Sequence, residues 1–530
     1  MRKQPSNPFR PTLEALGDRI VPTVSVVNGD IRIDSGNASD VVTVSRINAP
    51  GSAFRMAVDV YRVVENGTTT DIAVGRVTGG NVVFNGNAGN DRFENRTWLG
   101  ALATGGSGSD TLIGGPGDDY MLGGLGEDYI VGNGGSDQLF ANSDIDFTSD
   151  TSYNYVSGGD GLDYLHGSRG PDFIDGGRGE DYLFGYGGND QLYAAYGFGS
   201  DPSYNYVNAG DGNDAVYGGE GPEYVDAGDG NDTVYTYGGD DRVWGYAGND
   251  TLYGGGGVDT LDGGAGNDGL FGGTGDGRDT LVGGSGADRF LIPAGQNGVQ
   301  EDVITDRVSE DARIVFRDSA AVSGLTFTGQ TGTFSFAAGA WTDFDIERTD
   351  VALANLHSHT GNTRLLKTAG RGEVSLLAVG VQTDANTFRS GGWNSGNQIA
   401  IVDLRNETTG KLQRTVYHEF GHNWDEAGEN RHVADFRAVS GWIEREATPT
   451  GFTASTGTGD NWQYLTTTAG TFARNYGRTN PKEDMATTWE SYFVNLYHNG
   501  ATGLSLAGLT KNADKWATLD SLFVDLRESA

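Results

Sequence analysis

A nine-residue repeat runs through residues 84–292 and constrains the fold of this chain more than any other feature. Its pattern is Gly-Gly-x-Gly-x-Asp-x-apolar-x, and its first copy, Gly89-Asn90-Asp91, is degenerate. The glycines allow turns with positive φ, and the stretch around the apolar residue is typical of one short β-strand with that side chain inward. A fixed period of this kind predicts a solenoid of stacked coils, with two nonapeptides in each coil. The alternative, a flexible glycine-rich linker, does not account for a period held over so many copies.

Each repeat turn offers one aspartate carboxylate together with backbone carbonyl oxygens, and these are the hard ligands that Ca²⁺ prefers. Stacked coils would hold the ion between neighbouring turns. In one copy Glu223 stands in place of aspartate, and we do not count it as a ligand. The predicted calcium ligands are Asp110, Asp119, Asp128, Asp137, Asp163, Asp172, Asp181, Asp190, Asp214, Asp232, Asp241, Asp250, Asp259, Asp268, Asp279 and Asp288.

The apolar residue two positions after each acidic residue is a candidate for the buried core. In a strand that faces the interior of the solenoid, this side chain points inward and its neighbours point outward. The candidates are Leu112, Met121, Ile130, Leu139, Leu165, Ile174, Leu183, Leu192, Val216, Val225, Val234, Val243, Leu252, Leu261, Leu270 and Leu281.

The repeat region carries much of the negative charge of the chain. The formal net charge is −36, and residues 105–290 hold 33 Asp or Glu against five Arg and no Lys. Such a segment repels nucleic acid and anionic membranes and suits multivalent cations. No apolar run reaches the length of a transmembrane helix. We therefore expect calcium ions as partners, and neither nucleic acid binding nor membrane insertion. Because the chain has no Cys, no disulfide stabilises its fold.

This repeat strongly resembles the nonapeptide repeats of the RTX family, and the resemblance covers about two-fifths of the chain. It implies a parallel β-roll loaded with Ca²⁺. Without the ion, carboxylates stacked at close range would repel one another and the roll would melt. Weak calcium sites of this type are met by the millimolar Ca²⁺ outside cells, so we expect a secreted or cell-surface bacterial protein.

Two insertions interrupt the repeat, and both contain the pentapeptide Ser-Tyr-Asn-Tyr-Val, at residues 152–156 and 203–207. This duplication predicts two equivalent tyrosine-rich segments. If they project as loops, they could contact a glycan or a protein. The alternative is that they form extra coils whose tyrosines pack on the roll.

Residues 1–22 precede a β-rich segment and lack the apolar stretch of an ordinary signal peptide. The stretch Phe9–Pro22 resembles the LEPR-XLL motif of bacterial exported and surface proteins, which implies an export or sorting segment. Residues 23–83 alternate as strands do and are predicted to cap the roll, which spans 84–296. Residues 297–344 are predicted to hold closing strands, at 302–306 and 312–316, followed by a Gly/Thr-rich connection.

Hydrophobic periodicity changes from two to 3.6 in residues 345–530, which predicts an α+β domain. We expect a helix at 347–357, a helix that bears His418 and His422, further helices around 434–444, at 481–497 and near 515–527, and strands at 363–367, 374–379 and 398–403. A small sheet followed by helices is the plan of a zincin domain. In that plan Ile399–Val402 is an edge strand to which an extended substrate could pair.

The segment His418-Glu419-Phe420-Gly421-His422 has the spacing of a zinc-protease signature. Two histidines four apart on a helix share one face, so both imidazoles can reach one metal ion, and Glu419 can act as general base on a zinc-polarised water. The alternative is an amphipathic helix with two structural histidines. His357 and His359 are predicted to be surface or capping residues rather than ligands.

A catalytic zinc needs a third protein ligand and one open position. Gly428 stands six residues after His422, where a metzincin has its third histidine, so that pattern fails. A downstream glutamate is the natural candidate, and Glu483 follows the helix-start signals Asn480 and Pro481. Glu490, seven residues further along the same predicted helix, and His432 are the alternatives.

The set His418-Glu419-x-x-His422-x-x-Asp425, with Tyr476 seven residues before Glu483 and Ala486 three after it, resembles the gluzincin domain of the anthrax lethal factor-like metallopeptidases. The resemblance implies that His418, His422 and Glu483 bind zinc. It further implies that Glu419 is the general base, that Tyr476 stabilises the oxyanion, and that Asp425 orients a ligand histidine. Thr487 departs from the family, which often has a second acid after the Ala.

Together these patterns predict a multidomain protein, with a parallel β-roll followed by an α+β zincin-like metallopeptidase domain at 345–530. The expected function is that of an extracellular zinc endopeptidase carried on a calcium-binding β-roll, with Zn²⁺ and Ca²⁺ as cofactors and a protein or peptide as substrate. The alternative is a calcium-dependent surface or adhesion protein whose protease-like domain is inactive.

Overall fold

The structure is a computed structural model, which describes residues 23–49, 58–73, 76–78, 80–142, 150–195, 201–274, 277–294, 302–308, 311–318, 326–329, 332–360, 374–382, 392–395, 398–402, 409–427, 442–444, 452–454, 462–465, 486, 492–493 and 519. The chain divides into two compact units, Met1–Asp229 and Gly230–Ala530.

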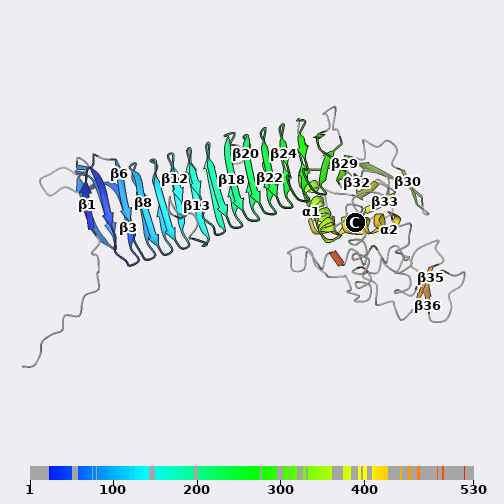
Figure 1. Cartoon of the computed structure of the whole chain (residues 1–530), viewed down its shortest axis with the longest axis horizontal. Helices are drawn as coiled ribbons and strands as arrows, with labels where there is room; N and C mark the ends of the chain where they lie inside the picture. Colours follow the sequence, from blue (N-terminus) through cyan, green and yellow to red (C-terminus); the bar gives the residue numbers. More distant parts are fainter. Residues whose placement is uncertain are drawn as a thin grey trace, which may run out of the picture. The chain divides into compact units, whose positions relative to one another are not determined.

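The first unit consists of two sheets built mainly from parallel strands (Figure 1). One sheet has the order β1 (Thr23–Val27), β2 (Asp30–Asp34), β6 (Asn81–Asn85), β8 (Gly100–Ser107), β10 (Tyr120–Leu125), β12 (Gln138–Phe140), β14 (Tyr164–His166), β16 (Tyr182–Gly187), β18 (Asn205–Asp211) and β20 (Glu223–Asp229). The other has the order β5 (Thr68–Ala73), β4 (Val58–Glu65), β3 (Val41–Ala49), β7 (Arg92–Arg96), β9 (Thr111–Ile113), β11 (Tyr129–Gly134), β13 (Asn154–Asp160), β15 (Asp172–Arg178), β17 (Gln191–Tyr193) and β19 (Ala215–Tyr217).

Two nonapeptides make one coil, as the period predicts. Leu165 of β14 pairs with Leu183 of β16, and Ile174 of β15 pairs with Leu192 of β17, so each partner lies two repeats away in sequence. Every predicted core residue from Leu112 to Leu281 is fully buried. At roughly 1.5–3 kcal/mol for each buried aliphatic side chain, these residues contribute much of the driving force for folding.

The repeated pentapeptides belong to the coils, which confirms the second of the two alternatives for Tyr155 and Tyr206. Tyr155 in β13 stacks between Tyr129 and Phe173, with ring centroids 4.6 and 5.0 Å away. Tyr206 in β18 stacks on Tyr224 at 5.4 Å. The first tyrosine of each pentapeptide is more exposed, with 50% of Tyr153 and 38% of Tyr204 accessible to solvent.

The second unit continues the coil pattern and then adds helices. One sheet has the order β22 (Arg242–Ala247), β24 (Thr260–Asp262), β26 (Thr280–Val282) and β28 (Val303–Ile304). The other has the order β21 (Thr233–Tyr235), β23 (Thr251–Tyr253), β25 (Gly269–Phe271), β27 (Arg289–Pro293), β29 (Ala312–Asp318), β32 (Val374–Gln382), β34 (Gln398–Val402) and β33 (Gly392–Ser395). The strands β30 (Thr326–Gly329) and β31 (Gly332–Ala338) form a hairpin beside β32, and β35 (Trp442–Glu444), β37 (Trp462–Leu465) and β36 (Phe452–Ala454) form a small antiparallel sheet.

Two helices have their bounds described, α1 (Asp343–Thr360) and α2 (Thr409–Ala427). A capping box starts α1, because Asp345 N donates to Thr342 Oγ1 at 3.2 Å and Thr342 N donates to Asp345 Oδ2 at 3.2 Å. Leu353 on α1 and Val416 on α2 belong to the same buried cluster as Ile314 and Leu376 of the sheet. The expected helices at 347–357 and around His418 are thus confirmed, as are the strands at 374–379 and 398–403.

Several expectations for the second unit are wrong. Residues 398–402 do not form an edge strand, because β34 pairs with β32 on one side and with β33 on the other. Residues 442–444 form a strand rather than the end of a helix, and the connection predicted after Phe316 contains the hairpin of β30 and β31. Of the two roles predicted for His357, the surface role is wrong, because the residue is only 4% exposed; it lies in the last turn of α1. The expected export segment at 1–22 and the strand at 363–367 lie outside the described residues.

Candidate calcium ladder and metallopeptidase site

The repeat aspartates form ladders in which each coil is hydrogen-bonded to the next. Asp110 N donates to Asp128 Oδ1 at 2.8 Å, and Asp163 N donates to Asp181 Oδ1 at 3.0 Å. In the second unit Asp250 N donates to Asp268 Oδ1 at 2.8 Å. One carboxylate oxygen of each ladder residue therefore holds the backbone turn of a neighbouring coil.

The second carboxylate oxygen is buried and, in many copies, accepts no hydrogen bond from another residue of the described chain. A buried carboxylate oxygen without a partner is costly, since it loses its hydration and gains nothing in return. The oxygens of this kind are the Oδ2 atoms of Asp91, Asp110, Asp128, Asp137, Asp163, Asp181, Asp190, Asp250, Asp259, Asp268 and Asp288. A bound cation would supply the missing partner.

Glycines beside the repeat aspartates let a backbone carbonyl oxygen come close to the same Oδ2 atom. A Cβ added at Gly158 would lie 2.7 Å from Gly176 O and would collide with Asp163 Oδ2. Gly254 has the same relationship to Asp259 Oδ2 and to Gly272 O. Only glycine leaves room here, and the oxygens that converge on it are the ligand type that Ca²⁺ takes. The residues therefore fit calcium.

Burial strongly disfavours the charged form of these carboxyl groups. The pKa of Asp190 is raised to about 9: burial raises it most, the backbone N–H of Asp172 lowers it, and the neighbouring carboxylates of Asp172 and Asp214 raise it. Burial likewise raises the pKa of Asp128 and of Asp250 to about 8. Deprotonated ladders at neutral pH therefore need a positive charge close by.

In Asp119 and Asp172, two of the predicted calcium ligands, the second carboxylate oxygen is already used. Asp119 Oδ2 accepts Gly115 N at 2.9 Å, and Asp172 Oδ2 accepts Ser168 N at 2.6 Å. In the same way Glu223 Oε1 accepts Gly219 N at 3.1 Å. In these copies the acidic side chain closes its own turn.

Sequence reasoning missed members of the ladders. Asn154 and Asn205 take the place of aspartate, with Asp128 N donating to Asn154 Oδ1 and Asp181 N donating to Asn205 Oδ1, both at 3.0 Å. The sequence held a signal for them, because the apolar Val156 stands two residues after Asn154, as an apolar residue does after each repeat aspartate.

The ends of the ladders contain further acidic residues. At one end, Asp40 N donates to Asp91 Oδ1 at 2.7 Å. At the other, Asp288 N donates to Asp311 Oδ1 at 3.2 Å, and Asp279 N donates to Asp302 Oδ1.

The family model of the RTX calcium-binding nonapeptide repeat matches this chain in several stretches. They are residues 75–95, 104–146 and 157–192 and, overlapping one another, 204–234, 217–252, 235–270, 244–277 and 273–291. The repeat region is an array of RTX repeats. RTX repeats bind Ca²⁺ and are typical of secreted proteins, so the chain is a calcium-binding extracellular protein. A search of curated proteins returned no match. Among the described residues, no helix is long and apolar enough to cross a membrane.

The described part of the chain contains no group of three or more His, Cys, Asp or Glu side chains placed to hold one metal ion. An RTX turn needs no such group, since it combines one carboxylate with backbone carbonyl oxygens. Which RTX aspartates bind Ca²⁺ stays a prediction for each residue.

The zinc-site residues are only partly within the described chain. His418 and Glu419 lie on α2, and both are buried, at 6% and 4% exposure. The backbone of α2 is a continuous helix through His422 and Asp425, whose side chains are not described. Tyr476, Glu483, Glu490 and His432 lie outside the described residues, so the third ligand and the oxyanion donor stay predictions.

The neighbour of His418 on α2 connects this helix to α1. Tyr417 is fully buried, and its hydroxyl group accepts a hydrogen bond from Asn355 Nδ2 at 2.9 Å. Tyr417 also stacks on Phe493, with ring centroids 5.4 Å apart. These contacts fix the turn of α2 that carries His418 and Glu419.

Proposed function

We propose that the chain is a zinc-dependent endopeptidase carried on its calcium-binding RTX roll. The observation that carries the proposal is that His418-Glu419-x-x-His422 falls on one continuous helix, α2. The helical spacing of four residues sets both histidines on the same face. His418 and Glu419 are both buried, as residues of a water-excluding site are. In this proposal His418, His422 and Glu483 bind zinc.

The proposed reaction is hydrolysis of a peptide bond. Zinc would supply a Lewis acid that polarises water and the substrate carbonyl group. Glu419 would accept a proton from the attacking water and later donate it to the leaving amine. Tyr476 would donate a hydrogen bond to the oxyanion that forms at the carbonyl oxygen. Asp425 would orient one of the ligand histidines.

We propose that an extended substrate pairs with β33 rather than with β34. Among the described strands β33 is the outer one, because β34 already has partners on both sides, and α2 packs against β33 and β34. In the proposal, Gly392–Ser395 therefore presents the free backbone groups to the substrate.

The test is hydrolysis of a casein-type substrate by purified, calcium-loaded protein, with zinc content measured on the same samples. Glu419→Gln should keep zinc and lower the turnover by at least about 10²-fold, since it removes the general base. The matched control is Glu220→Gln, which makes the same change at an exposed position of the first unit and should change neither quantity. Retained hydrolysis in Glu419→Gln would contradict the proposed mechanism.

The same assay identifies the third ligand. Glu483→Ala should lose zinc, and Glu490→Ala should keep it, because a catalytic zinc site uses three protein ligands. Zinc loss only in Glu490→Ala, or only in a His432→Ala variant, would identify that residue as the third zinc ligand instead of Glu483. Zinc bound at full occupancy without hydrolysis of any substrate would favour the adhesion protein with an inactive protease-like domain.

A further inference from the structure

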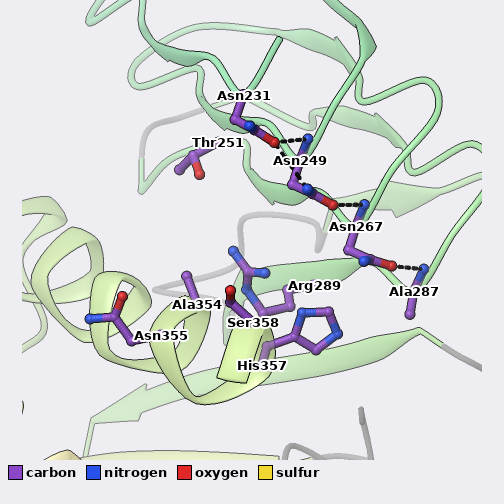
Figure 2. A pocket seen from close by; sticks show the side chains of 10 residues that line it. All are labelled: Asn231, Asn249, Thr251, Asn267, Ala287, Arg289, Ala354, Asn355, His357 and Ser358. Atoms are coloured by element: carbon purple, nitrogen blue, oxygen red, sulfur yellow. Dashed lines mark hydrogen bonds between the residues drawn. The ribbon is translucent and has the colours of Figure 1, made fainter. Parts of the chain in front are cut away.

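A cavity of about 490 Å³ lies in the second unit, between the edge of the last coils and the C-terminal half of α1 (Figure 2). Asn249 and Asn267 come from turns of the roll, Arg289 begins β27, and Asn355, His357 and Ser358 come from α1. The volume is that of a site for one small molecule. None of the residues that line the cavity is acidic, although the chain carries a net charge of −36.

The wall on the roll side is a ladder of asparagines from successive coils. Asn249 N donates to Asn231 Oδ1 at 2.8 Å, Asn267 N donates to Asn249 Oδ1 at 2.8 Å, and Ala287 N donates to Asn267 Oδ1 at 2.9 Å. Because a backbone N–H can donate only to the oxygen of a carboxamide, the orientation of each amide is fixed. The amide oxygens accept these bonds, and the Nδ2 groups are the donors that the ladder contributes to this wall. One of them, Asn249 Nδ2, already donates to Asn231 Oδ1 at 2.9 Å.

The cationic group of the cavity is the guanidinium of Arg289, which lies between the asparagine ladder and α1 in Figure 2. The residue is 3% exposed, and its Nε approaches Asp350 Oδ1 at 3.3 Å. Gly269 makes room for it, since a Cβ there would lie 2.6 Å from Arg289 Nη2. The ion pair holds the guanidinium in place through Nε and leaves its Nη groups as further donors.

The residues that line the cavity suit neither a divalent cation nor an apolar ligand. A divalent cation would find no carboxylate in the wall and no unengaged amide oxygen of the ladder. An apolar ligand would find only Ala287 and Ala354 as apolar lining residues. The donors suit an anion with several further acceptor oxygens, and the hydroxyl groups of Thr251 and Ser358 can both donate to and accept from ligand hydroxyls.

We propose that this cavity binds a sugar acid, with the carboxylate facing Arg289 and the hydroxyl and ring oxygens facing the asparagine ladder. The carboxylate end of a peptide has the same charge. It would need apolar room for a side chain, which the two alanines do not provide. The proposal does not rest on the proposed peptidase activity, because none of the residues that line the cavity is a predicted zinc ligand or catalytic residue.

The test is saturation-transfer NMR on the full chain in excess Ca²⁺, with glucuronate as the probe, glucose as its neutral counterpart and N-acetyl-alanyl-alanine as the peptide carboxylate. Asn267→Asp is the informative variant. Its Oδ1 can still accept Ala287 N, while the donor Nδ2 becomes an oxygen that repels the ligand carboxylate. Asn189→Asp is the matched control, because Asn189 Oδ1 accepts Asn213 N at 2.9 Å in the first unit, outside the cavity.

We expect glucuronate to show saturation transfer and glucose and the peptide to show little. Asn267→Asp should weaken glucuronate binding at least about tenfold, and Asn189→Asp should leave it unchanged. Circular dichroism and calcium content verify that both variants fold alike. The proposal is overturned by equal binding of glucose and glucuronate, by unchanged binding in Asn267→Asp, or by stronger saturation of the peptide than of glucuronate.

Discussion

The hydroxyl group of Tyr253 donates a hydrogen bond to Asp350 Oδ2 at 3.1 Å, while Arg289 Nε holds the other oxygen of the same carboxylate. Tyr253 and Arg289 belong to strands of the last coils, and Asp350 belongs to α1. All three side chains are buried. The helix is thus attached to the coils by one buried carboxylate, which is satisfied only while those strands are in place.

Asp350→Asn should destabilise this attachment strongly, because it leaves the Arg289 guanidinium buried without its counter-charge. Breaking one partner of a buried pair costs about 3–5 kcal/mol. Tyr253→Phe removes one hydrogen bond to a charged group and should cost about 1.5–3 kcal/mol.

Amide hydrogen exchange of α1 in calcium-loaded protein measures the effects of both substitutions. Tyr129→Phe, at an exposed stacked tyrosine of the first unit, should leave the exchange of α1 unchanged. Equal exchange in Asp350→Asn and the unchanged protein would refute the attachment.

Removing calcium should unfold the roll. The ladders hold carboxylates in successive coils, and the Oδ2 atoms of residues such as Asp128 and Asp259 are buried without a hydrogen-bond partner. Far-UV circular dichroism after exhaustive chelation at pH 8 should therefore lose its β-signal, and added Ca²⁺ should restore it. Mg²⁺ is the control, because it dehydrates reluctantly and demands octahedral geometry, so it should restore little. An unchanged β-signal in calcium-free protein is the contrary result.

Not every repeat aspartate should bind calcium. Asp119 has both oxygens engaged, by Ala101 N and Gly115 N, whereas Asp128 has only one engaged. Asp128→Asn should therefore lower the number of bound calcium ions, and Asp119→Asn should leave it unchanged. Calcium titration by calorimetry, with the metal content of the saturated protein, gives the two numbers. A loss of calcium in Asp119→Asn as large as that in Asp128→Asn would show that the self-closed turns also bind the ion.

The pH dependence of stability should reverse when calcium is removed. Burial raises the pKa of Asp190 to about 9 and that of Asp181 to about 8, far above the value of about 4 for an unfolded chain. Without calcium, the folded roll takes up these protons, so its stability is fully present below about pH 4 and is lost as the pH rises to about 8–9. With calcium, proton and metal compete, so stability should fall on acidification.

Thermal unfolding followed by circular dichroism tests these two opposite pH dependences of stability. It is measured in chelator and in calcium, each at pH 5 and at pH 8. The chelated protein should show a melting transition at pH 5 that is absent at pH 8, whereas the calcium-loaded protein should melt at a higher temperature at pH 8 than at pH 5. If both samples gain stability as the pH rises, the carboxyl groups are not buried in the calcium-free roll.

Much of the roll could be predicted because its information is local and repeated. The apolar residue two positions after each aspartate, such as Leu183, is fully buried, and the coil length follows from the period. The asparagines Asn154 and Asn205 were missed because they lack the aspartate that marks the other copies of the repeat. Their side chains present the same acceptor oxygen to the ladder, so the geometry tolerates the exchange.

The outer strand of the sheet that contains β34 could not be predicted in the same way. The sequence of Ile399–Val402 predicts a strand, and the strand is there, but its neighbours are set by pairing between distant segments. Gly392–Ser395 returns antiparallel to cover β34 and becomes the outer strand itself. Hydrophobic periodicity reports which side of a strand is buried and carries no information on which strand lies beside it.

By itself, the sequence determined the repeat, its coils, the buried core residues and the need for a cation, since each nonapeptide is a nearly self-contained turn. It also determined the helix that carries His418, Glu419 and His422, through the spacing of its residues. Only the tertiary structure decided which carboxylate oxygens are left for calcium, as the contrast of Asp119 with Asp128 shows, because that depends on turn closure in three dimensions. It alone decided that Asp350 joins Tyr253 and Arg289, which lie 97 and 61 residues away, because long-range partners are chosen by packing.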